Sequence, residues 1–376
     1  MQHTAGISRR GFTKLLGVGA TWATLQPARA IVPGIAALDV KRAAAGGMVR
    51  LSSNENPYGP SPAALTAMTA GFDLAWRYPD EHADMLIDDL AKLNQVTAKQ
   101  VLLGNGSGEI LKLAALAFTG ADRKLVFADP TFEAIGAHAR MNHAQVVKVP
   151  LTADYRHDLE RMMDAARDAG LVYICNPNNP TASITPKAEV RSFLAKASPQ
   201  TVVLIDEAYH HYVETSDYES VIPLTRDFPN LIVARTFSKV YAMAGLRCGY
   251  CITNERNIEL MRQQQTWDSV NIMAIVAARA SLKDAEQVTQ GQRRNSEVKR
   301  YVYAELDRMG YRYIPSQANF MMIDLRREVR PVIAAMRQHN VEVGRSFPAL
   351  GNFMRVTIGT RPQMESFLTT FRSVVG

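Results

Sequence analysis

Short runs of apolar, often β-branched residues recur through the middle of the chain. Three of them are Leu171–Cys175, Thr201–Ile205 and Leu231–Ala234. Runs of this length predict buried strands. Between the first two, apolar residues keep helical spacing from Lys187 to Ala197, so a helix should separate them. This alternation predicts an α/β fold in which helices cover a mainly parallel sheet.

The pattern changes near Trp267. Beyond it, helical stretches at Ala274–Leu282 and Glu297–Met309 accompany a shorter strand-like segment, Asn319–Asp324. Before Pro62 the chain is rich in Pro, Asn and Gly, which predicts an extended N-terminal arm rather than a helix. We therefore divide the chain into an arm, a large domain and a smaller C-terminal α+β domain: residues 31–62, 63–266 and 267–376.

The first thirty residues predict an export signal. Ser8–Lys14 resembles the twin-arginine pattern, a mildly apolar stretch follows at Leu15–Leu25, and Ala28–Ala30 offers a small-x-small cleavage site. The apolar stretch is too short to span a membrane. We expect a periplasmic protein, exported in the folded state, or a cytoplasmic one if the signal does not function. The alternative is an ordinary basic N-terminus.

Charge and cysteine content limit the function classes. The formal charge is +7, and four basic residues lie in the signal, so the remainder carries about +3. The basic residues are dispersed, which argues against a nucleic-acid partner. We interpret Cys175, Cys248 and Cys251 as buried apolar residues, because a disulfide within one strand is sterically unfavourable and a metal site would need more ligands. We predict no metal site and, after export, no membrane partner.

Polar side chains follow each of the three predicted strands. In chain order they are Asn179, then Asp206 and Tyr209, then Thr236, Ser238 and Lys239. Parallel strands bind ligands outside their carboxyl ends, so these groups should converge on one crevice. A lysine nucleophile needs a lowered pKa, which burial and the cation of Arg247 would supply. Taken alone, Lys239 would be a solvated turn residue.

A glycine-rich turn lies between the short strand that begins at Val101 and an amphipathic helix that starts near Ile110. Gly106, Ser107 and Gly108 could aim backbone N–H groups at a phosphate, backed by the helix N-terminus. A dinucleotide-binding turn is the alternative. That pattern would place a glycine at position 109, where Glu109 stands.

Several motifs in order resemble one family. Leu51–Pro60, Asn176–Thr181, Asp206–Tyr209, Arg235–Tyr250 and Met354–Thr360 together are similar to the fold-type-I, pyridoxal-phosphate-dependent aminotransferases, and most similar to the histidinol-phosphate aminotransferases. The resemblance covers nearly the whole chain after the signal. It implies pyridoxal 5'-phosphate as cofactor, a homodimer, and transfer of an amino group between an amino acid, or a histidinol-phosphate-like amine, and a 2-oxo acid.

The resemblance also implies a role for each candidate residue. Lys239 would form the Schiff base and then act as general base and acid. Asp206 would keep the ring nitrogen protonated, while Asn179 and Tyr209 would hold the phenolic oxygen. Phe132 would stack on the ring, although core packing would also suit it. The phosphate would be held by donors from two segments and from the partner subunit: Ser107 with its flanking glycines, Thr236, Ser238, Arg247, and Tyr58 of the other chain.

Two arginines near the C-terminus are the candidates for substrate recognition. By resemblance Arg355 binds the substrate α-carboxylate, together with Asn179, and Arg345 helps to hold a distal anionic group. Either arginine could instead form a surface salt bridge. One departure from the family is Ala182, where the motif has glycine; a positive φ there would strain the alanine. The pair His210–His211 is interpreted as structural or substrate-lining.

Three other functions stay open at this point. A pyridoxal-phosphate-dependent decarboxylase is the closest, because the same scaffold serves that reaction. A non-catalytic, cofactor-binding regulator would normally carry a DNA-binding module, and none is expected before the arm. A dinucleotide oxidoreductase would leave Lys239 without a use. Small-molecule amino acids and 2-oxo acids are therefore the expected partners.

Overall fold

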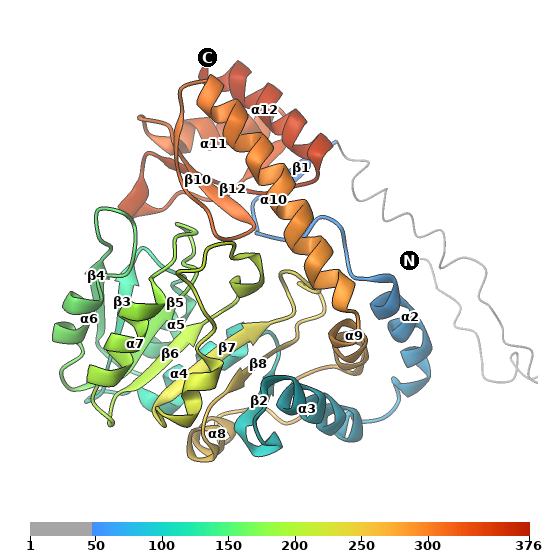
Figure 1. Ribbon diagram of the computed structural model, residues 1–376, viewed down its shortest axis with the longest axis vertical. Coiled ribbons are helices and arrows are strands. Elements are labelled where there is room, and N and C mark those ends of the chain that lie inside the picture. Colours follow the sequence, from blue (N-terminus) through green and yellow to red (C-terminus); the bar gives the residue numbers. More distant parts are fainter. Residues whose placement is uncertain (1–46) are drawn as a thin grey trace, which may run out of the picture. The chain divides into compact units, whose positions relative to one another are not determined.

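Seven strands form the central sheet in the computed structural model, which describes residues 47–376 (Figure 1). The strand order is β2-β8-β7-β6-β5-β3-β4. β8 runs antiparallel to both of its neighbours, and the remaining pairs are parallel. The strands in this order are Val101–Gly104, Gly249–Ile252, Leu231–Thr236, Val202–Asp206, Ala169–Cys175, Lys124–Asp129 and Val146–Pro150. The predicted α/β fold of mainly parallel strands is confirmed.

Alternate residues of each strand enter different cores, one on each face of the sheet. In β5, Val172 and Ile174 join one core while Leu171 and Tyr173 join the other. This follows from the two-residue period of a strand, and it explains why the strands are apolar throughout. Three helices cover the face of Leu171 and Tyr173: α4 Ser107–Phe118, α5 Ala134–Met141 and α8 Glu255–Arg262. Five helices cover the face of Val172 and Ile174: α2 Pro62–Gly71, α3 Asp80–Asn94, α6 Leu159–Ala165, α7 Lys187–Lys196 and α9 Ile272–Leu282.

A third core lies in the C-terminal part, drawn in orange and red at the top of Figure 1. It is built on the antiparallel sheet β12-β10-β9 and the parallel pair β1-β11. The strands are β1 Val49–Leu51, β9 Arg312–Ile314, β10 Phe320–Asp324, β11 Val341–Val343 and β12 Phe353–Thr357. The helices are α10 Ala285–Arg308, α11 Val329–Gln338 and α12 Arg361–Val375.

The division into cores differs from the predicted domain limits at two places. Helix α9, assigned by sequence to the smaller domain, packs on α2 and α3, because Ala274, Ile275 and Ala278 belong to the core of the large sheet. Conversely, Leu51, from the predicted arm, is buried in the C-terminal core. The change of pattern at Trp267 therefore marks a loop within the large domain's packing.

The cysteine interpretation is confirmed, since Cys175, Cys248 and Cys251 are all buried and free. Within residues 47–376, no helix is both long and apolar enough to cross a membrane. The predicted export signal and the first part of the arm, residues 1–46, lie outside the described residues.

Candidate active site

The carboxyl ends of β5, β6 and β7 open into one pocket of about 330 Å³. Most of the predicted site residues line it: Ser107, Gly108, Phe132, Asn179, Asp206, Tyr209, Thr236, Ser238, Lys239, Arg247 and Arg355. Most of them lie at or just beyond the carboxyl ends of the parallel strands, which the sheet brings to the same edge, and Arg355 comes from β12. The structure thus assembles the predicted set at one place.

Lys239 has a perturbed amine. Its Nζ donates a hydrogen bond to the backbone oxygen of Asn54 at 3.2 Å. Burial and the positive charge of Arg355 lower the lysine pKa to about 8, while Glu55 and Asp206 oppose this. Arg247, which the sequence suggested as the responsible cation, has a smaller influence than Arg355. A lysine with such a pKa is partly neutral near pH 7.5, as a nucleophile or general base requires.

Asp206 lies at the end of β6 and is only 3% exposed. Its carboxylate accepts hydrogen bonds from the Tyr173 hydroxyl and from the Ala208 backbone N–H, each at 3.0 Å. Burial raises the pKa of Asp206 to about 6, although these bonds act in the opposite direction. A buried carboxylate of this kind is stabilised by a cationic partner, which the protonated nitrogen of a pyridine ring would provide.

Asn179 and Tyr209 present donors to the pocket because their acceptors are already used. Asn179 Oδ1 accepts a 2.7 Å hydrogen bond from Arg355 Nη1, which leaves its NH₂ group to donate. The Tyr209 hydroxyl accepts from Asn54 Nδ2 at 3.1 Å, so its own proton is available. This arrangement fits the predicted binding of a phenolic oxygen.

Two glycines let hydrogen-bond donors gather closely at the N-terminus of α4. Gly106 has φ +72°, and a Cβ there would lie 2.2 Å from Arg247 Nη2. At Gly249, a Cβ would lie 2.3 Å from the Ser107 backbone nitrogen. The Thr236 hydroxyl donates to Ser238 Oγ at 2.9 Å, and Arg247 Nη1 donates to the same oxygen at 3.4 Å. Backbone N–H groups, hydroxyls and a guanidinium at a helix N-terminus are suited to an anion.

Two strands of the sheet are clamped together behind these donors. Arg235, beside Thr236 on β7, donates from Nε and Nη2 to Glu207 Oε2 at 3.0 and 2.8 Å. Glu207 directly follows Asp206 on β6, so the buried ion pair fixes the strand that carries the carboxylate against the strand that leads to Lys239. Two hydrogen bonds from one guanidinium to a single buried carboxylate oxygen restrict geometry as well as contributing energy.

Arg355, on β12, is the predicted residue that connects the two parts of the site. Besides its bond to Asn179, its Nη2 donates to the Ser52 backbone oxygen at 2.7 Å. Its buried Nε has no hydrogen-bond partner within residues 47–376. A buried donor without a partner is costly, so this atom marks a place where a ligand acceptor would be favourable.

Besides Gly106, four residues that the sequence analysis considered for the site do not line the pocket. Arg345 lines a neighbouring cavity together with Arg355. Tyr58 is 41% exposed, and its ring packs under the guanidinium of Arg294, so this chain does not bring it to its own pocket. The rings of His210 and His211 are tilted against each other with their centroids 3.6 Å apart, and burial lowers the pKa of both. These histidines are therefore neutral and structural near pH 7.

Among the residues of the site that the sequence analysis missed, Tyr173 and Asn54 make the most informative contacts. Tyr173 looked like an ordinary apolar strand position, but the alternation that directs Cys175 into the pocket also places Tyr173 beneath Asp206. Asn54 has φ 56° and is buried, and it bonds Tyr209, Lys239 and Thr357. Asparagine tolerates positive φ, so an Asn inside a Pro-rich motif was the available signal.

Comparison with known proteins agrees with this geometry. The family model described as aminotransferase class I and II matches residues 46–371. The chain belongs to this family. This aminotransferase is 38% identical over 332 residues to a histidinol-phosphate aminotransferase of Moorella thermoacetica, covering 87% of the chain and 86% of the relative. It is 37% identical over 349 residues to the histidinol-phosphate aminotransferase of Symbiobacterium thermophilum. This match covers 92% of the chain and 96% of the relative.

Solved structures share the fold of the aminotransferase. A chain from Erwinia carotovora atroseptica, provisionally named a histidinol-phosphate aminotransferase, superposes with a TM-score of 0.85 at 30% identity, covering 87% of this chain and 96% of that one. The histidinol-phosphate aminotransferase of Sinorhizobium meliloti, in complex with pyridoxal 5'-phosphate, superposes with a TM-score of 0.81 at 24% identity. This match covers 87% of this chain and 90% of that one. An L-threonine-O-3-phosphate decarboxylase from Porphyromonas gingivalis superposes with a TM-score of 0.75 at 23% identity, covering 87% of this chain and 99% of that one.

The aminotransferase therefore uses pyridoxal phosphate, and the pocket residues fit that cofactor. The donors beside Gly106 and Gly249 would hold its phosphate, and the Asp206 carboxylate would pair with a cationic ring nitrogen. When bound, the cofactor supplies an electron sink for chemistry at the carbon that bears the amino group. The protein's own contribution would be to hold the cofactor and to move a proton with Lys239.

Proposed function

We propose that this aminotransferase takes its amino group from a donor with a distal anionic group, of the histidinol-phosphate class, and passes it to a 2-oxo acid. The observation that carries the proposal is the pair of arginines at the pocket mouth. Arg355 has a buried, unpartnered Nε in the described part of the chain, and Arg345 lines the adjoining cavity. Arginine forks suit planar carboxylates and phosphates.

Each arginine would bind a different part of the substrates. Arg355 would bind the carboxylate of the 2-oxo acid, and Arg345 would bind the distal anion of either substrate. Lys239, with its pKa near 8, would take a proton from the substrate carbon that bears the amino group and return it two atoms away, in a 1,3 proton shift. Asn179 and Tyr209 would fix the plane in which this transfer occurs.

A donor panel tests the substrate proposal. The purified holoenzyme would be given L-histidinol phosphate, L-glutamate and L-phenylalanine, with 2-oxoglutarate or pyruvate as acceptor. We expect the highest kcat/KM for the phosphate-bearing donor, with one oxo product formed per amino group transferred. Release of carbon dioxide without an oxo product would favour a decarboxylase instead. The Lys239→Ala variant should lose turnover with every donor.

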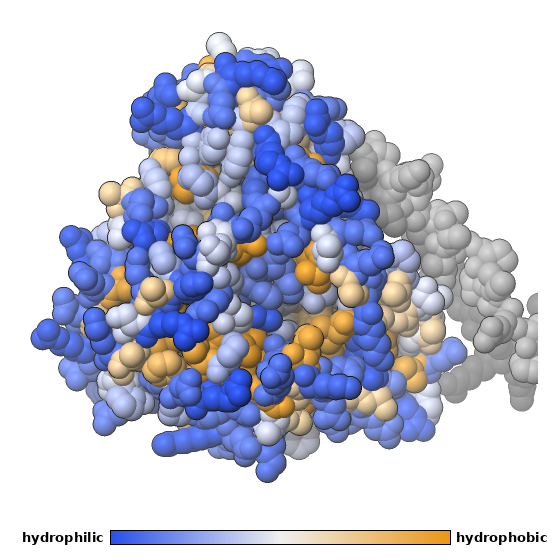
Figure 2. Space-filling view, viewed as in Figure 1, coloured by the Kyte–Doolittle hydropathy of each residue, from blue (hydrophilic) through white to orange (hydrophobic). Residues whose placement is uncertain are grey.

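We also propose that the protein is a homodimer. Aromatic and aliphatic side chains are exposed along α2 and α3 and the turn between them, with Trp76 at 75% and Tyr78 at 81% exposure. Residues of high hydropathy also gather in Figure 2 in the region where Figure 1 places α2 and α9. A patch of this kind commonly marks a protein interface. Light scattering should give twice the chain mass, and a fully active monomer would contradict the proposal.

Export of the folded protein to the periplasm is a further proposal, supported by the paired arginines and the cleavage pattern of residues 1–30. Fusing these residues to a reporter tests it. The proposal predicts a cleaved, periplasmic reporter, and replacement of Arg9 and Arg10 by lysine should retain it in the cytoplasm. A wild-type fusion that stays uncleaved in the cytoplasm would refute it.

A further inference from the structure

Arg345 already has an acidic partner in the structure. Its Nη2 donates to Glu133 Oε1, and the two side chains are 53% and 54% exposed. The residues are 212 positions apart in the sequence. Glu133 lies between β3 and α5 in the large domain, whereas Arg345 follows β11 in the smaller one. The ion pair therefore joins the two domains beside the pocket mouth.

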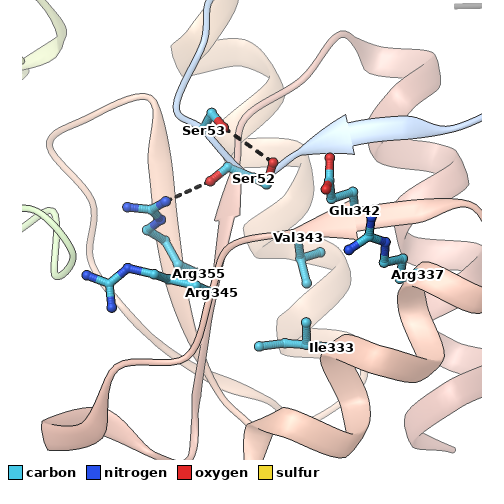
Figure 3. A pocket seen from close by; sticks show the side chains of 8 residues that line it. All are labelled: Ser52, Ser53, Ile333, Arg337, Glu342, Val343, Arg345 and Arg355. Carbon is cyan, nitrogen blue, oxygen red and sulfur yellow. Dashed lines mark hydrogen bonds between the residues drawn. The ribbon is translucent and has the colours of Figure 1, made fainter.

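The position of this pair relates it to substrate binding. Glu133 directly follows Phe132, which lines the active-site pocket. Arg345 and Arg355 line the same cavity of about 500 Å³, and Arg355 also lines the active-site pocket. Their guanidinium groups lie 4.3 and 5.4 Å from the centroid of the Phe347 ring. Figure 3 shows the two arginines extending side by side, away from Glu342 and Arg337.

The negative charge of Glu133 affects which groups can bind at Arg345. An anion that approaches Arg345 must replace the Glu133 carboxylate or accept it as a like-charged neighbour. A neutral group at the same place meets neither cost. Since an exposed ion pair is weak, displacement is feasible and its cost is modest.

We propose that Glu133 is a specificity-determining residue, which competes with the distal anion of a substrate for Arg345 and so lowers the preference for anionic over neutral substrates. The inference rests on the proposed role of Arg345, but it does not depend on which amine is the donor. Specificity is a difference between two affinities, and a repulsive element is one way to set it.

Acceptor preference in the holoenzyme measures this effect with any donor that the protein uses. 2-Oxoglutarate has a distal carboxylate and pyruvate has none. In Glu133→Gln we expect kcat/KM for 2-oxoglutarate to rise about fivefold, while the value for pyruvate stays within about twofold. Glu219→Gln is the matched control, because it removes a carboxylate from another exposed pair, with Arg191. It should leave the ratio unchanged.

Equilibrium binding gives a second readout that needs no turnover. Glutarate and butyrate, a dicarboxylate and a monocarboxylate of similar length, would be titrated into wild-type and Glu133→Gln holoenzyme. Only glutarate should bind more tightly to the variant. In the Arg345→Gln background, Glu133→Gln should no longer raise the preference for the dianion, because the competition acts through Arg345.

Two results would overturn the inference. The first is an unchanged ratio of kcat/KM for the two acceptors, whether both values stay the same or both change equally. The second is a fall in the preference for 2-oxoglutarate, which would mean that Glu133 positions Arg345 for the substrate. Failure of the proposed function looks different. In that case phosphate-bearing amines would not be used as donors, while the acceptor ratio could still respond to Glu133→Gln.

Discussion

Asp206 should make the cofactor-free protein less stable near neutral pH. Its carboxyl is 3% exposed, and burial raises its pKa from 3.8 to about 6. At about 1.4 kcal/mol per pKa unit, this difference corresponds to about 3 kcal/mol. The folded-state pKa lies above the unfolded one, so the folded state gains relative stability on protonation. That stability is fully present below about pH 4 and is lost as the pH rises through 6.

Asp206→Asn removes the charge and keeps the shape. The amide oxygen can still accept from the Ala208 N–H, and the amide nitrogen can donate to the Tyr173 hydroxyl oxygen. We expect the free energy of unfolding of the cofactor-free variant to exceed that of the wild type at pH 7.5 by up to about 3 kcal/mol. The attraction between Asp206 and Lys239 is already contained in the shifted pKa of Asp206, so it needs no separate allowance. The gain should vanish near pH 4.

Urea unfolding of both cofactor-free proteins at pH 7.5 and pH 4 measures this directly. A parallel titration with pyridoxal phosphate should show that the variant binds the cofactor more weakly, although its fold is more stable. A variant that is no more stable at pH 7.5, or one with the same gain at both pH values, would refute the electrostatic argument.

Three further substitutions test separate parts of the site. Gly106→Ala places a Cβ against Arg247, so cofactor affinity should fall at least about tenfold, whereas Gly310→Ala, also at positive φ but with open space around it, should not change it. Tyr173→Phe removes a hydrogen-bond donor to Asp206, so the pKa of Asp206 should rise and the pH profile of cofactor binding should shift to higher pH. Tyr212→Phe, at another buried tyrosine, is the control and should leave the profile unchanged. Arg355→Met removes the charge that most lowers the Lys239 pKa, so the pH midpoint for cofactor capture by the cofactor-free protein should rise, which Arg294→Met should not cause.

Residues that follow strands could be predicted from sequence because their placement depends on a local pattern. An apolar run of about five residues defines a buried strand, and the parallel arrangement then directs its next polar residues to a common edge. Asn179, Asp206 and Lys239 were found in this way, and all three line the pocket. The positive φ of Ala182, 58°, likewise follows from a local motif in which glycine is usual.

Contacts between distant segments could not be predicted in the same way. Asn54 and Thr357 are 303 positions apart, and so are Ser52 and Arg355, yet both contacts shape the site. No periodicity in either segment encodes the other. For the same reason the sequence named Arg247 as the cation beside Lys239, whereas folding brings Arg355 from β12 to that role. The ion pair of Glu133 and Arg345 is a third example.

One arginine thus serves both substrate binding and the chemistry of Lys239. Arg355 is the proposed receptor for the substrate carboxylate, and its charge is the main one that lowers the Lys239 pKa. A carboxylate bound to Arg355 would offset that charge and raise the affinity of the lysine for a proton. Since such coupling is reciprocal, a neutral Lys239 and an empty Arg355 favour each other. The lysine would be the stronger base once a substrate carboxylate is in place, which confines proton transfer to the occupied site.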